Sequence, residues 1–265
     1  SSKAQVSQTT TTLKNVIDLN INTKDTNEYE SLPFGEPDWV EIPSGDFWLG
    51  SEKGNKNEKP VHKVYLDTFQ ISRTPITNRQ YSLFIQATGY PHPKLWESNN
   101  VPKSLDNHPV VTVSFDDVLF YCQWLSEVIG KTITLPSEAE WEKAARGDKD
   151  RREYTWGNAF DSSLCNCKEA SRGTTSIVGS YPQGASPYGV LDMCGNVWEW
   201  TADCWSDKHA GNPGDGSPRR GTPCHGRVLR GGSWLDHPSN IRAAARDGGP
   251  LGDGIIGLRV ARSLD

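Results

Sequence analysis

Three segments in the first half of the chain carry apolar residues at the spacing of amphipathic helices. They span residues 77–89, 114–130 and 137–147. Each opens with Thr or Ser, has Gln, Asp or Glu three residues later, and ends at a glycine. The first two features together form a capping box, and glycine ends a helix readily because it adopts left-handed conformations. The pattern therefore predicts three helices within these ranges.

The rest of the pattern indicates short strands and loops. Residues 39–51, WVEIPSGDFWLGS, hold two apolar runs around the turn-forming group Pro43-Ser44-Gly45-Asp46, which predicts two short strands. After Gly147 no helical period is found, and the chain contains 25 Gly, 17 Pro and 10 Trp. We therefore expect an irregular α+β domain whose loops and short strands are held by aromatic residues.

Residues 1–34 differ from the rest because they are polar, rich in Thr and Asn, and without a sustained period. Such a composition buries too little apolar surface to offset the entropy lost on ordering. We expect a linker or flexible N-terminal arm over 1–34, able to tether one domain over 35–265 to another domain. Because the chain begins with Ser and Met193 is its single Met, we expect a fragment, a processed chain or an engineered chain.

Charge and hydropathy exclude several classes of partner. The formal net charge is −5 and the pI is about 5.7, so no basic surface for nucleic acid is expected. No apolar run is long enough to span a bilayer, and no secretory leader is evident, so we expect no membrane insertion. These absences favour the cytoplasm of a bacterium or archaeon, although the compartment stays open.

The six cysteines allow up to three disulfides, but the chain is too long to depend on them. We expect free or partly paired thiols in a reducing compartment. The spacing of Cys165 and Cys167 does not fit a zinc knuckle, and no His pair completes one.

Several motifs follow one another in an order typical of a known family. They include EIPSGDFWLGS, TLPSEAEWEKAARG, YGVLDMCGNVWEWTADCW, RVLRGGSW and GLRVAR. From about residue 38 to its end, the chain resembles the formylglycine-generating enzyme (sulfatase-modifying factor) domain. The resemblance implies a C-type-lectin-like fold of the α+β class with little regular secondary structure.

The resemblance also identifies which chemistry to look for. Enzymes of this family oxidise a substrate cysteine with two active-site cysteines, five residues apart, that bind copper. The matching positions here are Asp236 and Ile241, and neither side chain binds a soft cation. We therefore expect no catalytic residues, no copper and no formylglycine chemistry.

A structural Ca²⁺ site is a further implication of the resemblance. Its ligands would be the side chains of Asp192 and Glu199 and the main-chain carbonyls of Gly195 and Val197. Hard oxygen ligands of this kind suit Ca²⁺. The alternative is a buried aromatic turn in which Glu199 forms a salt bridge with an arginine.

The stretch between Leu235 and Arg259 contains no Lys, Glu, Gln, Met or Trp. These are the five amino acids that no codon ending in C or T encodes. They are therefore excluded if each varied codon began as an Asn codon and only its two adenines changed. This pattern and the flanking GGSW and GLRV motifs resemble the variable proteins of diversity-generating retroelements.

We interpret the residues between the motifs as a variable, ligand-binding region over about 235–255. Its predicted variable positions are Leu235, Asp236, His237, Ser239, Asn240, Ile241, Ala243, Ala245, Asp247, Gly248, Gly249, Leu251, Gly252, Asp253, Gly254 and Ile255. Variation is tolerated where side chains have no packing or hydrogen-bonding role, so we expect them on one exposed face. Trp234, Arg242, Arg246 and Leu258 are expected to anchor this face from beneath.

The sequence thus favours a non-catalytic display protein that binds an unidentified ligand, which we expect to be a protein. Two alternatives stay open. The first alternative is an enzyme of the same superfamily with altered chemistry. The second is a regulatory module attached to an effector domain. A variable face by its nature does not reveal its ligand.

Overall fold

The computed structural model describes residues 35–248 and 254–264 and contains the three predicted helices. They are α2 (Asn78–Thr88), α3 (Phe115–Ile129) and α4 (Glu138–Arg146). The hydroxyls of Thr77, Ser114 and Ser137 accept hydrogen bonds from the backbone three residues on, and each capping box is complete. Gly89 and Gly130 end α2 and α3 with left-handed φ angles of 69° and 73°. The helix predictions are confirmed.

The strands form three small sheets. The first has the order β1 (Trp39–Ile42), β4 (Phe69–Ser72) and β9 (Ala261–Ser263), and the second pairs β2 (Gly45–Leu49) with β3 (His62–Leu66). The third has the order β7 (Arg246–Asp247), β6 (Arg227–Arg230), β5 (Trp198–Cys204) and β8 (Ile256–Gly257). The two strands predicted within residues 39–51 are present, but the turn between them is confined to Pro43 and Ser44 because Gly45 already pairs with Leu66.

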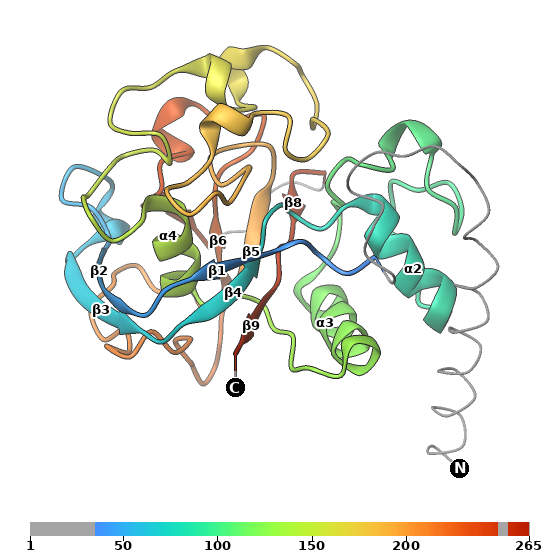
Figure 1. Ribbon diagram of the computed structural model, residues 1–265, viewed down its shortest axis with the longest axis horizontal. Coiled ribbons are helices and arrows are strands. Elements are labelled where there is room, and N and C mark those ends of the chain that lie inside the picture. Colours follow the sequence, from blue (N-terminus) through green and yellow to red (C-terminus); the bar gives the residue numbers. More distant parts are fainter. Residues whose placement is uncertain (1–34, 249–253, 265) are drawn as a thin grey trace.

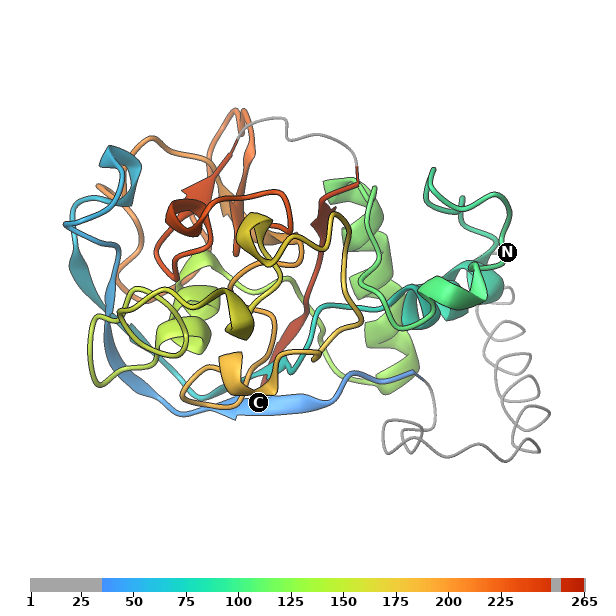
Figure 2. The ribbon, with the colours of Figure 1, turned by 90° about the horizontal axis from the view of Figure 1, so that it is seen from above.

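The elements divide the molecule into two ends. In both views α2 and α3 lie together at one end, whereas α4 lies among the sheets at the other (Figure 1, Figure 2). Residues 147–248 contain no α-helix and turn only through short 3₁₀ segments and loops. The prediction of an α+β domain with little regular structure is therefore confirmed.

Two apolar cores correspond to these two ends. The first packs α4 against strands β1 to β4, with Trp141 fully buried at its centre. The second packs α2 against α3, where the rings of Tyr81 and Tyr121 stack with centroids 5.3 Å apart. Leu258 and Val260 enter the second core, so the end of the chain contributes to it directly.

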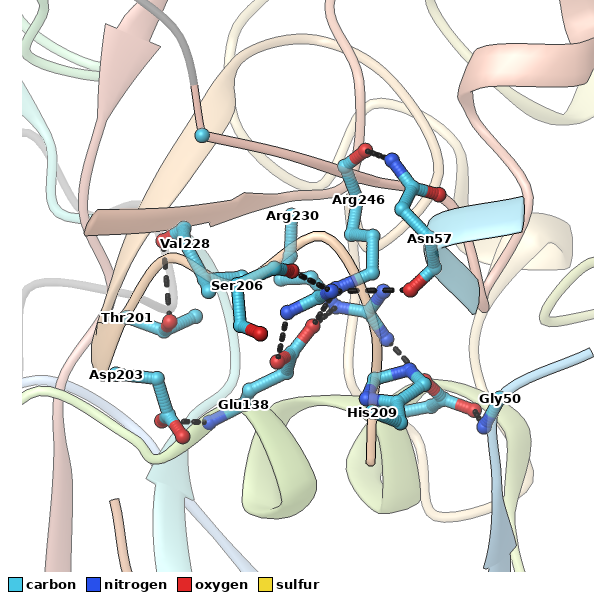
Figure 3. Close-up of polar contacts among 12 residues, drawn as sticks. Gly50, Asn57, Glu138, Thr201, Asp203, Ser206, His209, Val228, Arg230 and Arg246 are labelled. Carbon is cyan, nitrogen blue, oxygen red and sulfur yellow. Dashed lines mark hydrogen bonds and ion pairs between the residues drawn. The ribbon is translucent and has the colours of Figure 1, made fainter. Parts of the chain in front are cut away.

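Buried ion pairs connect the C-terminal segment to the rest of the domain. Both oxygens of Glu138 accept hydrogen bonds from Arg246 at 2.7 Å, and both oxygens of Glu58 accept from Arg242 at 2.6 and 2.9 Å. Figure 3 shows Arg246 between Glu138 and the backbone carbonyls of Asn57 and Ser206. A buried charge is tolerated only when it is paired in this way.

One expectation about the chain as a whole is met in part. Cys204 and Cys224 form a disulfide, and the other four cysteines are free and buried, so the thiols are partly paired. In the part of the chain that the structure describes, no helix has the length and apolar character needed to cross a bilayer.

The buried pairs predict how Glu138→Gln changes stability. The substitution should lower the free energy of unfolding by about 3–5 kcal/mol, because it leaves Arg246 charged and unpaired in the interior. Lys63 and Asp46 form an exposed pair at 3.9 Å, so Asp46→Asn is the control and should cost less than about 1 kcal/mol. Urea unfolding measures the free energy of unfolding of both variants. Equal losses in the two variants would contradict a stabilising buried pair between Glu138 and Arg246.

The same comparison should depend on pH. Burial by itself raises the pKa of Glu138, but the charges of Arg246 and Arg230 outweigh it and lower the pKa from 4.5 to about 2. A carboxyl with a lowered folded-state pKa stabilises the fold above its unfolded pKa, and this stabilisation is lost as the pH falls. The difference between the wild type and Glu138→Gln should therefore shrink from pH 4.5 toward pH 2.

Candidate ligand-binding face

The predicted variable region begins at a tightly packed turn after β6. Gly232 has a φ of 70°, and a Cβ at this position would lie 2.6 Å from the Ile241 side chain. The carboxylate of Asp236 accepts hydrogen bonds from Ser233 N–H at 2.9 Å, Ser233 Oγ at 2.6 Å and Trp198 Nε1 at 2.9 Å. Asp236 therefore fixes this turn, and the expectation that it has no hydrogen-bonding role is wrong.

Four predicted positions do lie on the surface. Leu235, His237, Ser239 and Asn240 are exposed, and we call these four residues the outer face. The last two belong to a 3₁₀ turn, Pro238–Asn240, that points the side chains away from the core. His237 Nδ1 lies 2.9 Å from Glu169 Oε1, within hydrogen-bond distance.

Three other predicted positions are buried, which corrects the expectation of a single exposed face. Ile241 and Ala243 are 0 % exposed and Ala245 is 2 % exposed. Ile241 packs in an apolar cluster with Tyr154 and Cys194. At the next two positions Arg230 donates hydrogen bonds to the carbonyls of Ala243, Ala244 and Ala245 at 3.0, 2.9 and 2.7 Å. These bonds hold the backbone against the interior, so the side chains become part of the core.

The expected anchors are confirmed with one exception. Arg242, Arg246 and Leu258 are buried beneath the segment. Trp234 is only partly buried and borders a cleft, so the expectation that it is a core anchor is wrong.

The structure describes four of the predicted positions at the C-terminal end of the variable region. Asp247, Gly248, Gly254 and Ile255 are half-buried. A Cβ on Gly248 would overlap the Trp205 ring, so packing requires this glycine. Gly249, Leu251, Gly252 and Asp253 lie outside the described residues.

A cleft of about 300 Å³ borders the region. Trp234, Leu235, Gly254 and Ile255 form one side of it. The opposite side comes from the chain between α2 and α3 and from residues 174–175, with Leu95 more than half exposed at the rim. No motif or period marked these opposite residues, because only the tertiary fold brings them to Leu235.

Two polar side chains of the cleft, His108 and Asn78, are already paired. His108 Nδ1 lies 2.9 Å from Thr175 Oγ1, and Asn78 Oδ1 accepts a hydrogen bond from Trp96 Nε1 at 3.0 Å. Burial, with a contribution from Arg172, lowers the pKa of His108, so this imidazole is neutral at pH 7. The cleft therefore offers an apolar rim and an uncharged interior.

The four predicted calcium ligands lie together before and within β5. However, Arg259 binds both oxygens of Glu199 at 2.6 and 2.9 Å, as in the alternative interpretation of this turn. Asp192 Oδ2 accepts a hydrogen bond from Gly179 N–H at 2.7 Å. Burial, with a contribution from Glu199, raises the pKa of Asp192 to about 6.

This arrangement fits a cation only in part. The second Asp192 oxygen and the carbonyl oxygens of Gly195 and Val197 are suitable ligands for a cation. However, the charge of Glu199 is already neutralised by Arg259. Among the described residues, no three His, Cys, Asp or Glu side chains converge in a way that could hold a metal ion. Calcium at this turn stays a prediction.

Residues 26–264 match the sulfatase-modifying factor enzyme 1-like domain. The chain belongs to this family. Its formylglycine-generating enzyme relative from Thermomonospora curvata is 33% identical, over 78% of this chain and 86% of that protein. A serine/threonine-protein kinase pkn1 of Chlamydia caviae is also 33% identical, over 78% of this chain but only 34% of the kinase.

Solved structures agree with the family fold. PvdO from Pseudomonas aeruginosa matches with a TM-score of 0.75 and 33% identity, over 87% of this chain and 95% of PvdO. The Treponema denticola variable protein 1 matches with a TM-score of 0.71 and 23% identity, over 85% and 94% of the two chains. The second likeness shows a shared fold only. The resemblance to the formylglycine-generating enzyme family is confirmed.

The division of the region into exposed and buried positions predicts opposite stability effects. Combining Leu235→Ser, His237→Tyr and Ser239→Thr should change the free energy of unfolding by less than about 1 kcal/mol, because these side chains are exposed. Ile241→Ala should cost about 2–5 kcal/mol, because it opens a cavity in a closed apolar cluster. Guanidinium midpoints measure both, and a triple variant as unstable as Ile241→Ala would contradict the division.

Proposed function

We propose that this protein is a non-catalytic binding protein whose C-terminal region, about residues 235–255, varies and forms one edge of the ligand cleft. One observation carries the proposal. The stretch that lacks five residue types supplies Leu235, Gly254 and Ile255 to the same side of the cleft. Variation there changes the binding surface without changing the core.

The two positions that carry the family's active-site cysteines support a non-catalytic role. Asp236 accepts three hydrogen bonds that hold the turn, and Ile241 is fully buried in an apolar cluster. Neither residue has a thiol that could bind copper or attack a substrate as the family's cysteines do.

The cleft favours a protein ligand. A volume of about 300 Å³ suits one large side chain, and exposed Leu95 and Leu235 provide apolar contact around it. Interfaces depend on such anchors, in which an apolar or aromatic side chain enters a desolvated pocket. A net charge of −5 disfavours nucleic acid as the partner.

A role as a regulatory module is the second candidate. Proteins named pkn1 from Chlamydia caviae and Chlamydia pneumoniae match this chain over only 34% and 38% of their lengths. In those kinases the matching part accompanies other sequence. A binding domain joined to an effector is compatible with a variable face, so the two candidates do not exclude each other.

Sequencing the gene across a population of the source organism tests the proposed function. We expect substitutions concentrated in codons 235, 237, 239, 240, 254 and 255, each explained by changes at the adenines of an Asn codon, while Gly232 and Arg242 stay constant. Codons 241, 243 and 245 should retain apolar residues, because their side chains are buried. A reverse-transcriptase gene and an Asn-codon-rich copy of the segment should lie nearby. Variation spread evenly along the gene would contradict the proposal.

We further propose that Ca²⁺ binds at the Asp192 turn beside the Arg259–Glu199 pair. Excess chelator should then lower the melting temperature, because an ion bound only by the folded state stabilises it by mass action. Asp192→Asn should reduce this shift. An unchanged melting curve, with no calcium by elemental analysis, would leave Arg259 as the only counter-charge and overturn the calcium proposal.

A further inference from the structure

A second, smaller pocket lies between the first turn of α3 and the chain that joins α2 to it. Its volume is about 230 Å³, and its lining shares no residue with the cleft beside Leu235. Tyr81 of α2, Asp117 of α3 and the connecting residues 91–94 and 112–113 form its walls. Pockets that hold drug-sized molecules measure about 300–1,000 Å³, so this one suits a single side chain.

A carboxylate forms the charged part of this pocket. Asp117 Oδ1 accepts a hydrogen bond from the Tyr90 hydroxyl at 2.7 Å, and Oδ2 accepts one from Ser114 N–H at 2.7 Å. These bonds orient the carboxylate, and each oxygen keeps a lone pair for a further donor. Burial, the hydrogen bond to Asp117 and the charges of Asp117 and Asp116 raise the pKa of Tyr90 to about 12. Two negative charges therefore act at the edge of the pocket.

The backbone of Thr112 forms part of the wall in a strained conformation. Its φ is 59°, in the left-handed region that a β-branched residue rarely adopts. Its hydroxyl donates to the Val111 carbonyl at 2.6 Å. Strain of this kind persists only where the surrounding structure holds it, and it is concentrated at ligand sites. This feature marks the pocket independently of its charge.

Exposed apolar side chains of α3 continue the surface of the pocket. Phe120 is 51 % exposed and its neighbour Leu119 is 45 % exposed. The centroid of the Phe120 ring lies 5.3 Å from that of Tyr90, which donates to Asp117, so the apolar surface adjoins the carboxylate. The sequence of α3 contains three carboxylates and no Lys or Arg. The surface is therefore complementary to a ligand that is both apolar and positively charged.

Two basic residues also line the pocket. His92 Nδ1 lies 3.0 Å from the Pro93 carbonyl oxygen, a contact within the loop itself. Lys94 is exposed, so water and salt screen its charge. Asp117 is half-buried and is screened less, so the interior of the pocket favours a cation.

Two other occupants fit this surface less well. A metal ion such as Ca²⁺ needs six or more oxygen ligands, whereas the described part of the chain brings no three acidic, His or Cys side chains together for a metal. A second copy of this chain, paired through the same face, would place Asp116 and Asp117 opposite their own copies. Like charges in such a contact are unfavourable.

We propose that this pocket binds the guanidinium group of an arginine from a partner protein, while apolar residues beside that arginine pack on Leu119 and Phe120. A guanidinium is planar, matches a carboxylate and stacks on aromatic rings, whereas the ammonium of lysine is a compact, strongly hydrated charge. The domain contains the same contact nearby, since the guanidinium carbon of Arg227 lies 4.1 Å from the centroid of the Phe115 ring. This surface is separate from the variable region and its binding does not depend on variation there.

A matched pair of peptides tests the proposal on the complete wild-type chain. Acetyl-Leu-Arg-Leu-amide is compared with the same peptide carrying citrulline, which keeps the shape of arginine and removes its charge. Ligand-observed NMR measures both dissociation constants. We expect saturable binding of the arginine peptide and about tenfold weaker binding of the citrulline peptide, because a charge-assisted hydrogen bond is lost. Equal affinities, or no binding of the arginine peptide, would overturn the proposal.

Variants then locate the site. Asp117→Asn should weaken binding of the arginine peptide about tenfold and Phe120→Ser about fivefold, because they remove the counter-charge and the apolar contact. Glu127→Gln is the matched control, because it removes the same charge from α3 outside the pocket, and it should change the affinity less than about twofold. Wild-type affinity in a folded Asp117→Asn variant would place the peptide elsewhere and overturn the proposal.

Two further outcomes separate this surface from other ligands. Leu235→Ser should leave binding of the arginine peptide unchanged, since Leu235 belongs to the other cleft. A loss of binding in Leu235→Ser equal to that in Asp117→Asn would contradict a separate site. Acetyl-arginine-amide, which lacks the two leucines, should bind more weakly than the peptide. Equal affinity would indicate a site for a free small cation and overturn the assignment to a partner protein.

Discussion

Buried pairs between arginines of the C-terminal segment and carboxylates of the scaffold are the constraint on which the rest of the structure depends. The pairs are Arg230 with Glu142, Arg242 with Glu58, Arg246 with Glu138 and Arg259 with Glu199. Each joins residues far apart in the sequence. Because an unpaired buried charge is strongly destabilising, the segment has one path across the domain that satisfies all four.

This constraint explains how a surface can vary on a fixed fold. Arginine binds a carboxylate through two parallel bonds, which sets orientation as well as distance. Arg242 and Arg246 therefore fix the backbone on both sides of Ala243 to Ala245, and the outer face lies on the turn just before them. Side chains there change without disturbing the pairs below. The same turn supplies Trp234 and Leu235 to one side of the cleft.

The turn around Gly195 links several features of the domain. Gly195 has a φ of 104°, and a Cβ there would overlap the carbonyl oxygen of Asn166. This close approach holds the chain that carries Cys165 and Cys167 against the start of β5. Trp234 N–H also donates a hydrogen bond to the Asn196 carbonyl at 3.1 Å, so the turn that precedes the outer face rests on the same backbone.

The sequence by itself determined the features that depend on local chemistry. Capping boxes at Thr77, Ser114 and Ser137 located the helices, ordered motifs identified the family, and missing residue types indicated a candidate variable region. Which side chains of that region are exposed was decided by tertiary structure alone. Ile241 and Ser239 are equally accessible from an Asn codon, but one faces the core and the other solvent. The pairing of Glu199 with Arg259, the opposite wall of the cleft and the apolar cluster around Ile241 also join distant residues. Such contacts carry no local pattern, because their energy depends on burial, which exists only once the chain has folded.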